Sequence, residues 1–171
     1  MTCPFTVGTN GRSAPALERV LALHDVENGP RYQPERREIA PGVFKWLTRC
    51  NLYVGDVTRA LACPIPLQWL VGVQWREQSA NDVVRWLRSD GVKQGWRKCT
   101  PAEAQARANL GFPAVAAWLN PVETDSGHVA MFRPDNGRAG LFIAQAGATN
   151  FTDGTLTHGF GARVVECATH D

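Results

Sequence analysis

The spacing of apolar residues changes along the chain. Before Gly111, apolar residues recur at intervals of three and four, as in Leu17, Val20 and Leu21. After Gly111 they fall in short runs that turn residues separate. The first pattern is typical of amphipathic helices and the second of short strands. The chain is therefore predicted to form helices first and an antiparallel sheet afterwards, which is an α+β fold.

Four helices are predicted from the spacing of three and four. They span about residues 14–24, 48–61, 79–88 and 101–109. Pro15 is acceptable in the first turn of the first helix, and Thr48 is a favourable N-cap for the second. Pro64 follows the second helix and cannot continue it.

Four strands are predicted after the helices, at residues 112–119, 128–132, 141–146 and 162–168. The turn residues 134–137 join the second strand to the third. The helix that begins near residue 48 is expected to pack on this sheet. Residues 1–13 are rich in Gly, Thr, Asn and Ser and are predicted to form an irregular arm on a single domain of 171 residues.

Composition narrows the function classes. The formal net charge of +2 and the absence of any run of five or more Lys or Arg speak against a nucleic-acid-binding surface. No basic stretch precedes an apolar run at the N-terminus, and no window approaches the roughly 18 apolar residues of a membrane span. We therefore expect synthesis in the cytoplasm without a signal peptide, so that a target elsewhere requires a delivery route. No metal-ligand spacing such as H-E-x-x-H occurs, and neither a metal nor a cofactor is predicted.

Cys50 is the candidate nucleophile. It lies in the first turn of the second predicted helix, on the side of the apolar stripe formed by Val54, Val57 and Leu61. A helix N-terminus favours a nearby anion and so lowers the pKa of a thiol. The alternative is that Cys50 is a small buried apolar residue. The chain has five cysteines without a C-x-x-C motif, and no predicted helix N-terminus lies beside the other four, which are Cys3, Cys63, Cys99 and Cys167.

His128 is the candidate base. It follows Gly127 and opens an apolar strand, from which its ring can take the thiol proton and return it to a leaving amine. The alternative is a ring that covers a sheet edge for structural reasons. Gln145 is the polar exception in the next strand, where it can face His128 and accept from the ring N–H, or instead point to solvent. Asn150 and Asp125 are the substitutes for this orienting role.

Three residues are predicted to contact substrate. Trp46 lies one turn before the nucleophile and is the tryptophan we expect to line a groove. Asn51 follows Cys50 directly, and Asn150 follows the strand that carries Gln145. We assign all three to substrate binding.

These motifs resemble those of the NlpC-type and CHAP cysteine peptidases and amidases. The matching segments are residues 50–61, 64–66, 127–131 and 144–147, and residues 80–84 are similar to a family helix. Within that group the chain is most similar to the small peptidoglycan amidases that type VI secretion systems inject or phages carry. The resemblance spans residues 46–147. The third catalytic position is often His, Asp, Asn or Glu in the family and would be Gln145 here.

The resemblance implies a papain-like core with the cysteine helix packed on a C-terminal antiparallel sheet. It also implies a hydrolase that cleaves an amide bond in the peptide stems of bacterial cell wall, with Cys50 as nucleophile and His128 as base. Such an enzyme acts after delivery, with an immunity protein, a secretion component or a phage component as partner. Two alternatives stay open: acyl transfer or deamidation on protein or lipid, and a non-catalytic module that binds cell wall.

Overall fold

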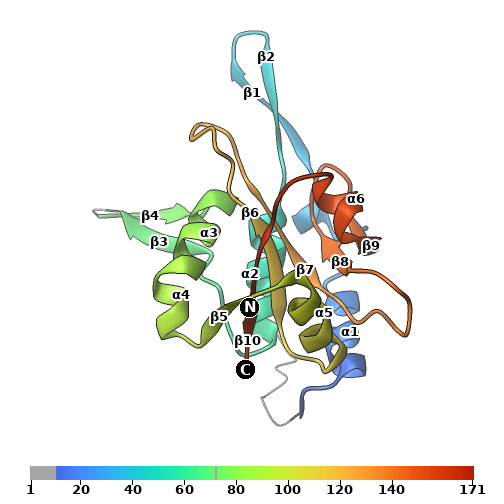
Figure 1. Ribbon diagram of the computed structural model, residues 1–171. Helices are drawn as coiled ribbons and strands as arrows, with labels where there is room; N and C mark the ends of the chain where they lie inside the picture. Colours follow the sequence, from blue (N-terminus) through green and yellow to red (C-terminus); the bar gives the residue numbers. More distant parts are fainter. Residues whose placement is uncertain (1–10, 72) are drawn as a thin grey trace.

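A six-stranded antiparallel sheet forms the centre of the molecule (Figure 1). The computed structural model describes residues 11–71 and 73–171. The strand order is β5-β10-β6-β7-β8-β9. The bounds are Trp96–Cys99 for β5, Ala114–Trp118 for β6, His128–Phe132 for β7, Phe142–Gln145 for β8, Phe151–Thr155 for β9 and Glu166–His170 for β10. The predicted α+β class is thus confirmed.

Helices cover both faces of the sheet. Residues of β6 from Ala114 to Ala117, all of β8 and most of β7 are buried, and successive strand residues point to opposite faces. Helix α2 (Cys50–Ala60) packs on β7 and β8, α3 (Ala80–Arg88) on β5, β6 and β7, and α5 (Pro101–Asn109) on β10, β6 and β7. The remaining helical segments are α1 (Ala14–Leu23), η2 (Pro30–Tyr32), α4 (Asp90–Lys93) and α6 (Leu156–Phe160). The cysteine helix therefore lies directly against the histidine strand, as predicted.

The predicted helices agree with the structure except at one cap. Ser79 caps α3 in a reciprocal capping box with Asp82, and α5 spans the predicted residues. Helix α2, however, begins at Cys50, with Arg49 in the N-cap position and without a side-chain cap hydrogen bond. The predicted N-cap Thr48 was therefore wrong. Its side chain lies instead near the Cys50 thiol, whose pKa it lowers.

Two hairpins were missed by the sequence prediction. Strands β1 (Glu35–Ala40) and β2 (Val43–Leu47) form the first, which stands away from the sheet in Figure 1. Strands β3 (Gln68–Val71) and β4 (Gln74–Glu77) form the second. Every residue of β1 is exposed, so its sequence carries charged side chains without the alternation that marks a half-buried strand. Gly42 closes the first hairpin with φ +74, a backbone conformation that glycine adopts readily.

The sheet itself was predicted in part. Strand β7 has the predicted bounds, and β6 and β8 lie within theirs. Strands β5 and β9 were not predicted, and β10 begins four residues later than the start of predicted strand 162–168. Most of the predicted arm, residues 1–10 with Cys3, lies outside the described residues, whereas Ser13 caps α1. Among the described residues, no helix is long and apolar enough to cross a lipid bilayer.

Candidate active site

Cys50 lies at the first position of α2, and 3% of its surface is exposed. The apolar stripe of the helix holds it there, because Val54, Val57 and Leu61 are buried with it in the core. No side chain caps the helix at the N-cap residue Arg49. The first-turn backbone N–H groups thus lie beside the sulfur without a capping side chain, and the positive end of the helix dipole favours the thiolate.

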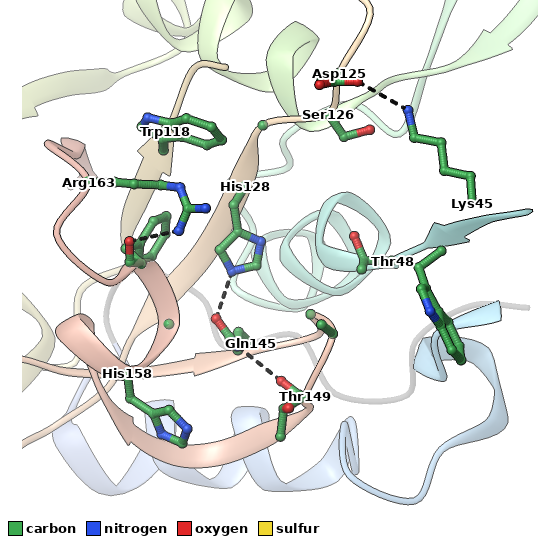
Figure 2. Close-up of a pocket in the computed structure, with 16 residues that line it drawn as sticks. Lys45, Thr48, Trp118, Asp125, Ser126, His128, Gln145, Thr149, His158 and Arg163 are labelled. Atoms are coloured by element: carbon green, nitrogen blue, oxygen red, sulfur yellow. Dashed lines mark hydrogen bonds and ion pairs between the residues drawn. The ribbon is translucent and has the colours of Figure 1, made fainter. Parts of the chain in front are cut away.

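His128 opens β7 and is fixed by Gln145 from the neighbouring strand (Figure 2). The Gln145 amide nitrogen donates to the carbonyl oxygen of Thr149 at 3.0 Å, which leaves the amide Oε1 facing the ring. His128 Nε2 lies 2.7 Å from that oxygen. Because an amide oxygen only accepts, Nε2 carries the proton and donates it. The other ring nitrogen, Nδ1, is therefore the one left to exchange a proton with Cys50.

The thiol and the imidazole shift each other's pKa in opposite directions. Burial alone would raise the pKa of Cys50. The pKa is nevertheless below its usual value, because the thiolate is stabilised by a hydrogen bond to His128, by the positive charge of His128, and by hydrogen bonds from the Val129 backbone and the Thr48 side chain. Burial alone would lower the pKa of His128, but the interaction with Cys50 and the hydrogen bond to Gln145 raise it. Each group therefore stabilises the charged form of the other, which is the direction that a thiolate–imidazolium pair requires.

The other described cysteines behave differently. Burial raises the pKa of Cys63 and of Cys167 to about 12, and that of Cys99 to about 11. None of these three is at a helix N-terminus beside a histidine. Among the described cysteines, Cys50 alone has a lowered pKa and lies at the start of a helix beside a histidine.

The pair lies between two clefts. The histidine-side cleft, about 540 Å³ in volume, is lined by His128, Gln145 and side chains of β2, β6 and the α6 region. The cysteine-side cleft, about 300 Å³, is lined by Cys50 and by residues at the end of β4 and the start of α3. Thr48 and Ser126 line both clefts. A substrate that spans the two clefts would place its reacting bond between the sulfur and the ring.

Two of the residues predicted to contact substrate, Trp46 and Asn51, line different clefts. Trp46, on β2, is 61% exposed and lines the histidine-side cleft. Asn51 lines the cysteine-side cleft, but its amide nitrogen already donates to Glu77 Oε1 at 2.9 Å and to the Gln78 carbonyl at 2.6 Å.

Neither substitute for the orienting role reaches His128. The Asn150 amide nitrogen donates to the carbonyls of Val26 and Tyr32, and its oxygen accepts from the Gly147 N–H. The side chain of Asn150 is therefore occupied in holding the loop behind Gln145. Asp125 forms an ion pair with Lys45 at 3.7 Å across the histidine-side cleft. The structure brings together Cys50, His128 and Gln145.

Sequence reasoning missed the residues that position the histidine. The Asn81 amide donates to the Asp125 carbonyl at 2.9 Å and accepts from the Asn120 N–H at 3.0 Å, which fixes the loop before β7. A Cβ on Gly127 would come within 2.4 Å of Asn81 Oδ1 and 2.3 Å of the Trp118 carbonyl oxygen, so only glycine fits there. An asparagine near a helix start gives no sequence signal that it holds a distant loop.

Among residues 11–71 and 73–171, no group of three or more His, Cys, Asp or Glu side chains is arranged to hold a metal ion. No protein-family model matches the chain, and a search of curated proteins found no match.

Proposed function

We propose that this chain is a cysteine amidase or endopeptidase of the NlpC/CHAP kind, with a papain-like core, that cleaves an amide bond in the peptide stems of bacterial peptidoglycan. In this proposal the protein reaches the cell wall of a target cell by secretion or phage delivery. The observation that carries it is the buried Cys50 thiol, with a lowered pKa, beside a His128 ring that Gln145 holds at 2.7 Å. The packing of the cysteine helix on an antiparallel sheet that carries the histidine also supports it.

The proposed reaction uses Cys50, His128 and the backbone at the start of α2. The Cys50 thiolate attacks the carbonyl carbon of the amide, and first-turn N–H groups of α2 stabilise the negative oxygen that forms. His128, protonated on both nitrogens, gives the Nδ1 proton to the departing amine, and a thioester remains on the sulfur. His128 then removes a proton from water, the water oxygen attacks the thioester, and the carboxylic acid leaves as the Cys50 thiolate and the protonated His128 are restored.

The proposal is tested with purified sacculi and mass spectrometry of the released fragments. Wild-type protein is expected to release fragments with a new amine and a new carboxyl group, whereas C50A and H128A are expected to release none above background. Each variant should unfold cooperatively, so that loss of turnover is separated from loss of fold. A protein-glutamine substrate is incubated in parallel, and modification of that substrate without cleavage of sacculi would favour the deamidase or acyltransferase alternative.

The non-catalytic alternative is tested by thiol labelling. Iodoacetamide at mildly acidic pH should modify Cys50 first, because an ordinary thiol with a pKa near 8.5 is then almost fully protonated. Uniformly slow labelling of all cysteines would contradict the thiolate–imidazolium pair and would favour a cell-wall-binding module.

A further inference from the structure

Arg163 is held at a fixed place in the histidine-side cleft. Its guanidinium carbon lies 4.7 Å from the centre of the Trp118 ring, and its Nη1 donates to the Phe160 carbonyl at 3.0 Å. Figure 2 shows the guanidinium between Trp118 and His128. Stacking on an indole and a backbone hydrogen bond restrict the side chain while leaving further N–H donors of the guanidinium unoccupied.

Arg163 differs from nearby cations in its ion pairing. Among the described residues, no Asp or Glu carboxylate forms an ion pair with it, whereas Lys45 in the same cleft is paired with Asp125 at 3.7 Å. Arg138 offers a comparison, because it also stacks on an aromatic ring, at 3.9 Å from Phe142, but is paired with Asp153 at 3.0 Å. Arg163 also disfavours the protonated form of His128. An unpaired cation next to a base that must hold a proton opposes catalysis unless an anion joins it.

The position of Arg163 shows which part of a substrate it would meet. The acyl half stays on the sulfur, which lines the cysteine-side cleft, and the amine half must reach His128 to receive its proton. The amine half therefore occupies the histidine-side cleft, where the guanidinium lies. A guanidinium binds a carboxylate through two parallel hydrogen bonds, with geometric selectivity that a point charge lacks.

We propose that Arg163 binds a carboxylate on the amine half of the substrate, so that the enzyme prefers bonds whose leaving amine belongs to an amino acid with a free carboxyl group. This inference rests on the proposed hydrolase function. A carboxylate bound there neutralises Arg163 and removes its unfavourable effect on the imidazolium. Substrate binding then helps His128 to keep the proton that the leaving amine requires.

The test compares two peptides that differ only in the leaving residue, which ends in a free carboxylate in one and in a carboxamide in the other. Wild-type protein is expected to show a kcat/KM ratio, acid over amide, of about ten or more, because hydrogen bonds to charged groups are each worth at least about tenfold. R163Q is expected to bring this ratio close to one, and R163K to give an intermediate value. R138Q is the matched control and should keep the wild-type ratio.

A wild-type ratio near one, or an R163Q ratio equal to that of wild type, overturns the inference while leaving the hydrolase function intact. If neither wild type nor any variant cleaves either peptide, the proposed hydrolase function is refuted. Carboxylate binding at Arg163 is then tested by a separate measurement. The amine half, as acid or as amide, is then added while iodoacetamide labels Cys50. Slower labelling of wild type by the acid form alone, lost in R163Q, supports the carboxylate site, and equal labelling rates overturn it.

Discussion

Replacing Gln145 by alanine tests whether Gln145 orients His128, the proposed catalytic base. Gln145 is 5% exposed and connects His128 Nε2 to the Thr149 carbonyl. In Q145A the His128 ring loses its hydrogen bond to the Gln145 amide oxygen and can rotate away from the Cys50 thiol. The hydrogen bond also stabilises the imidazolium, so its loss lowers the pKa of His128.

The size of the effect follows from the kind of bond lost. A hydrogen bond to a charged group is worth about 1.5–3 kcal/mol, which corresponds to a loss of about 10- to 150-fold in kcat/KM. The direction of the pH effect is also fixed. The reactive pair exists between the pKa of Cys50 and that of His128, so lowering the latter moves the alkaline limb of the activity profile to lower pH.

The assay combines kcat/KM on a stem peptide, the pH profile and thermal unfolding. Q105A is the matched control, because Gln105 is also 5% exposed and its amide bonds the Arg133 carbonyl at 2.8 Å and the Phe142 N–H at 2.7 Å, outside the site. Q105A should lower the unfolding temperature without moving the alkaline limb. If Q145A keeps kcat/KM within about threefold of wild type, or moves the alkaline limb no further than Q105A does, Gln145 does not orient the base.

Three further outcomes are expected. In C50A the pKa of His128 should fall, because burial remains and the thiolate that raised it is gone; NMR titration checks this against the other three histidine signals, and an unchanged value would contradict the ion pair. G159A should reduce kcat/KM and also lower the unfolding temperature, because its Cβ would lie 2.6 Å from Gln145 Oε1 and 2.6 Å from the buried Ile143 Cδ1; a kcat/KM equal to that of wild type would contradict the orienting role of the amide. N81A should lower the free energy of unfolding by about 1–3 kcal/mol, measured in urea, since two hydrogen bonds to the loop before β7 are lost; a change below about 0.5 kcal/mol would argue against that anchoring role.

The sequence predicted the parts of the site that depend on local signals. The helix spacing predicted the place of Cys50. His128 and Gln145 lie on two short strands joined by a turn, so these two side chains come together once the strands pair. Arg163 was not predictable, since it lies in a turn after α6 and reaches the site only through the fold. The hairpin of β1 was missed because its exposed charged residues lack a buried face.

Strand pairing across long distances was the other part beyond prediction. Periodicity identifies a strand but does not say which strands are neighbours. Strand β10 lies between β5 and β6, and among the strands that the structure describes β5 pairs with β10 alone. Prediction from runs of apolar residues also missed β5, Trp96–Cys99, because its two central residues are exposed and charged.

The place of β10 has a consequence for biosynthesis. Strand β5 has no neighbouring strand until residues 166–170 have been translated, because among the described strands β10 alone joins β5 to the rest of the sheet. The sheet against which the cysteine helix packs is thus completed only after its other five strands have been made. A nascent chain on the ribosome therefore lacks the strand that joins β5 to β6 until residue 170 has been made, although β7 and β8, on which α2 packs, are already present.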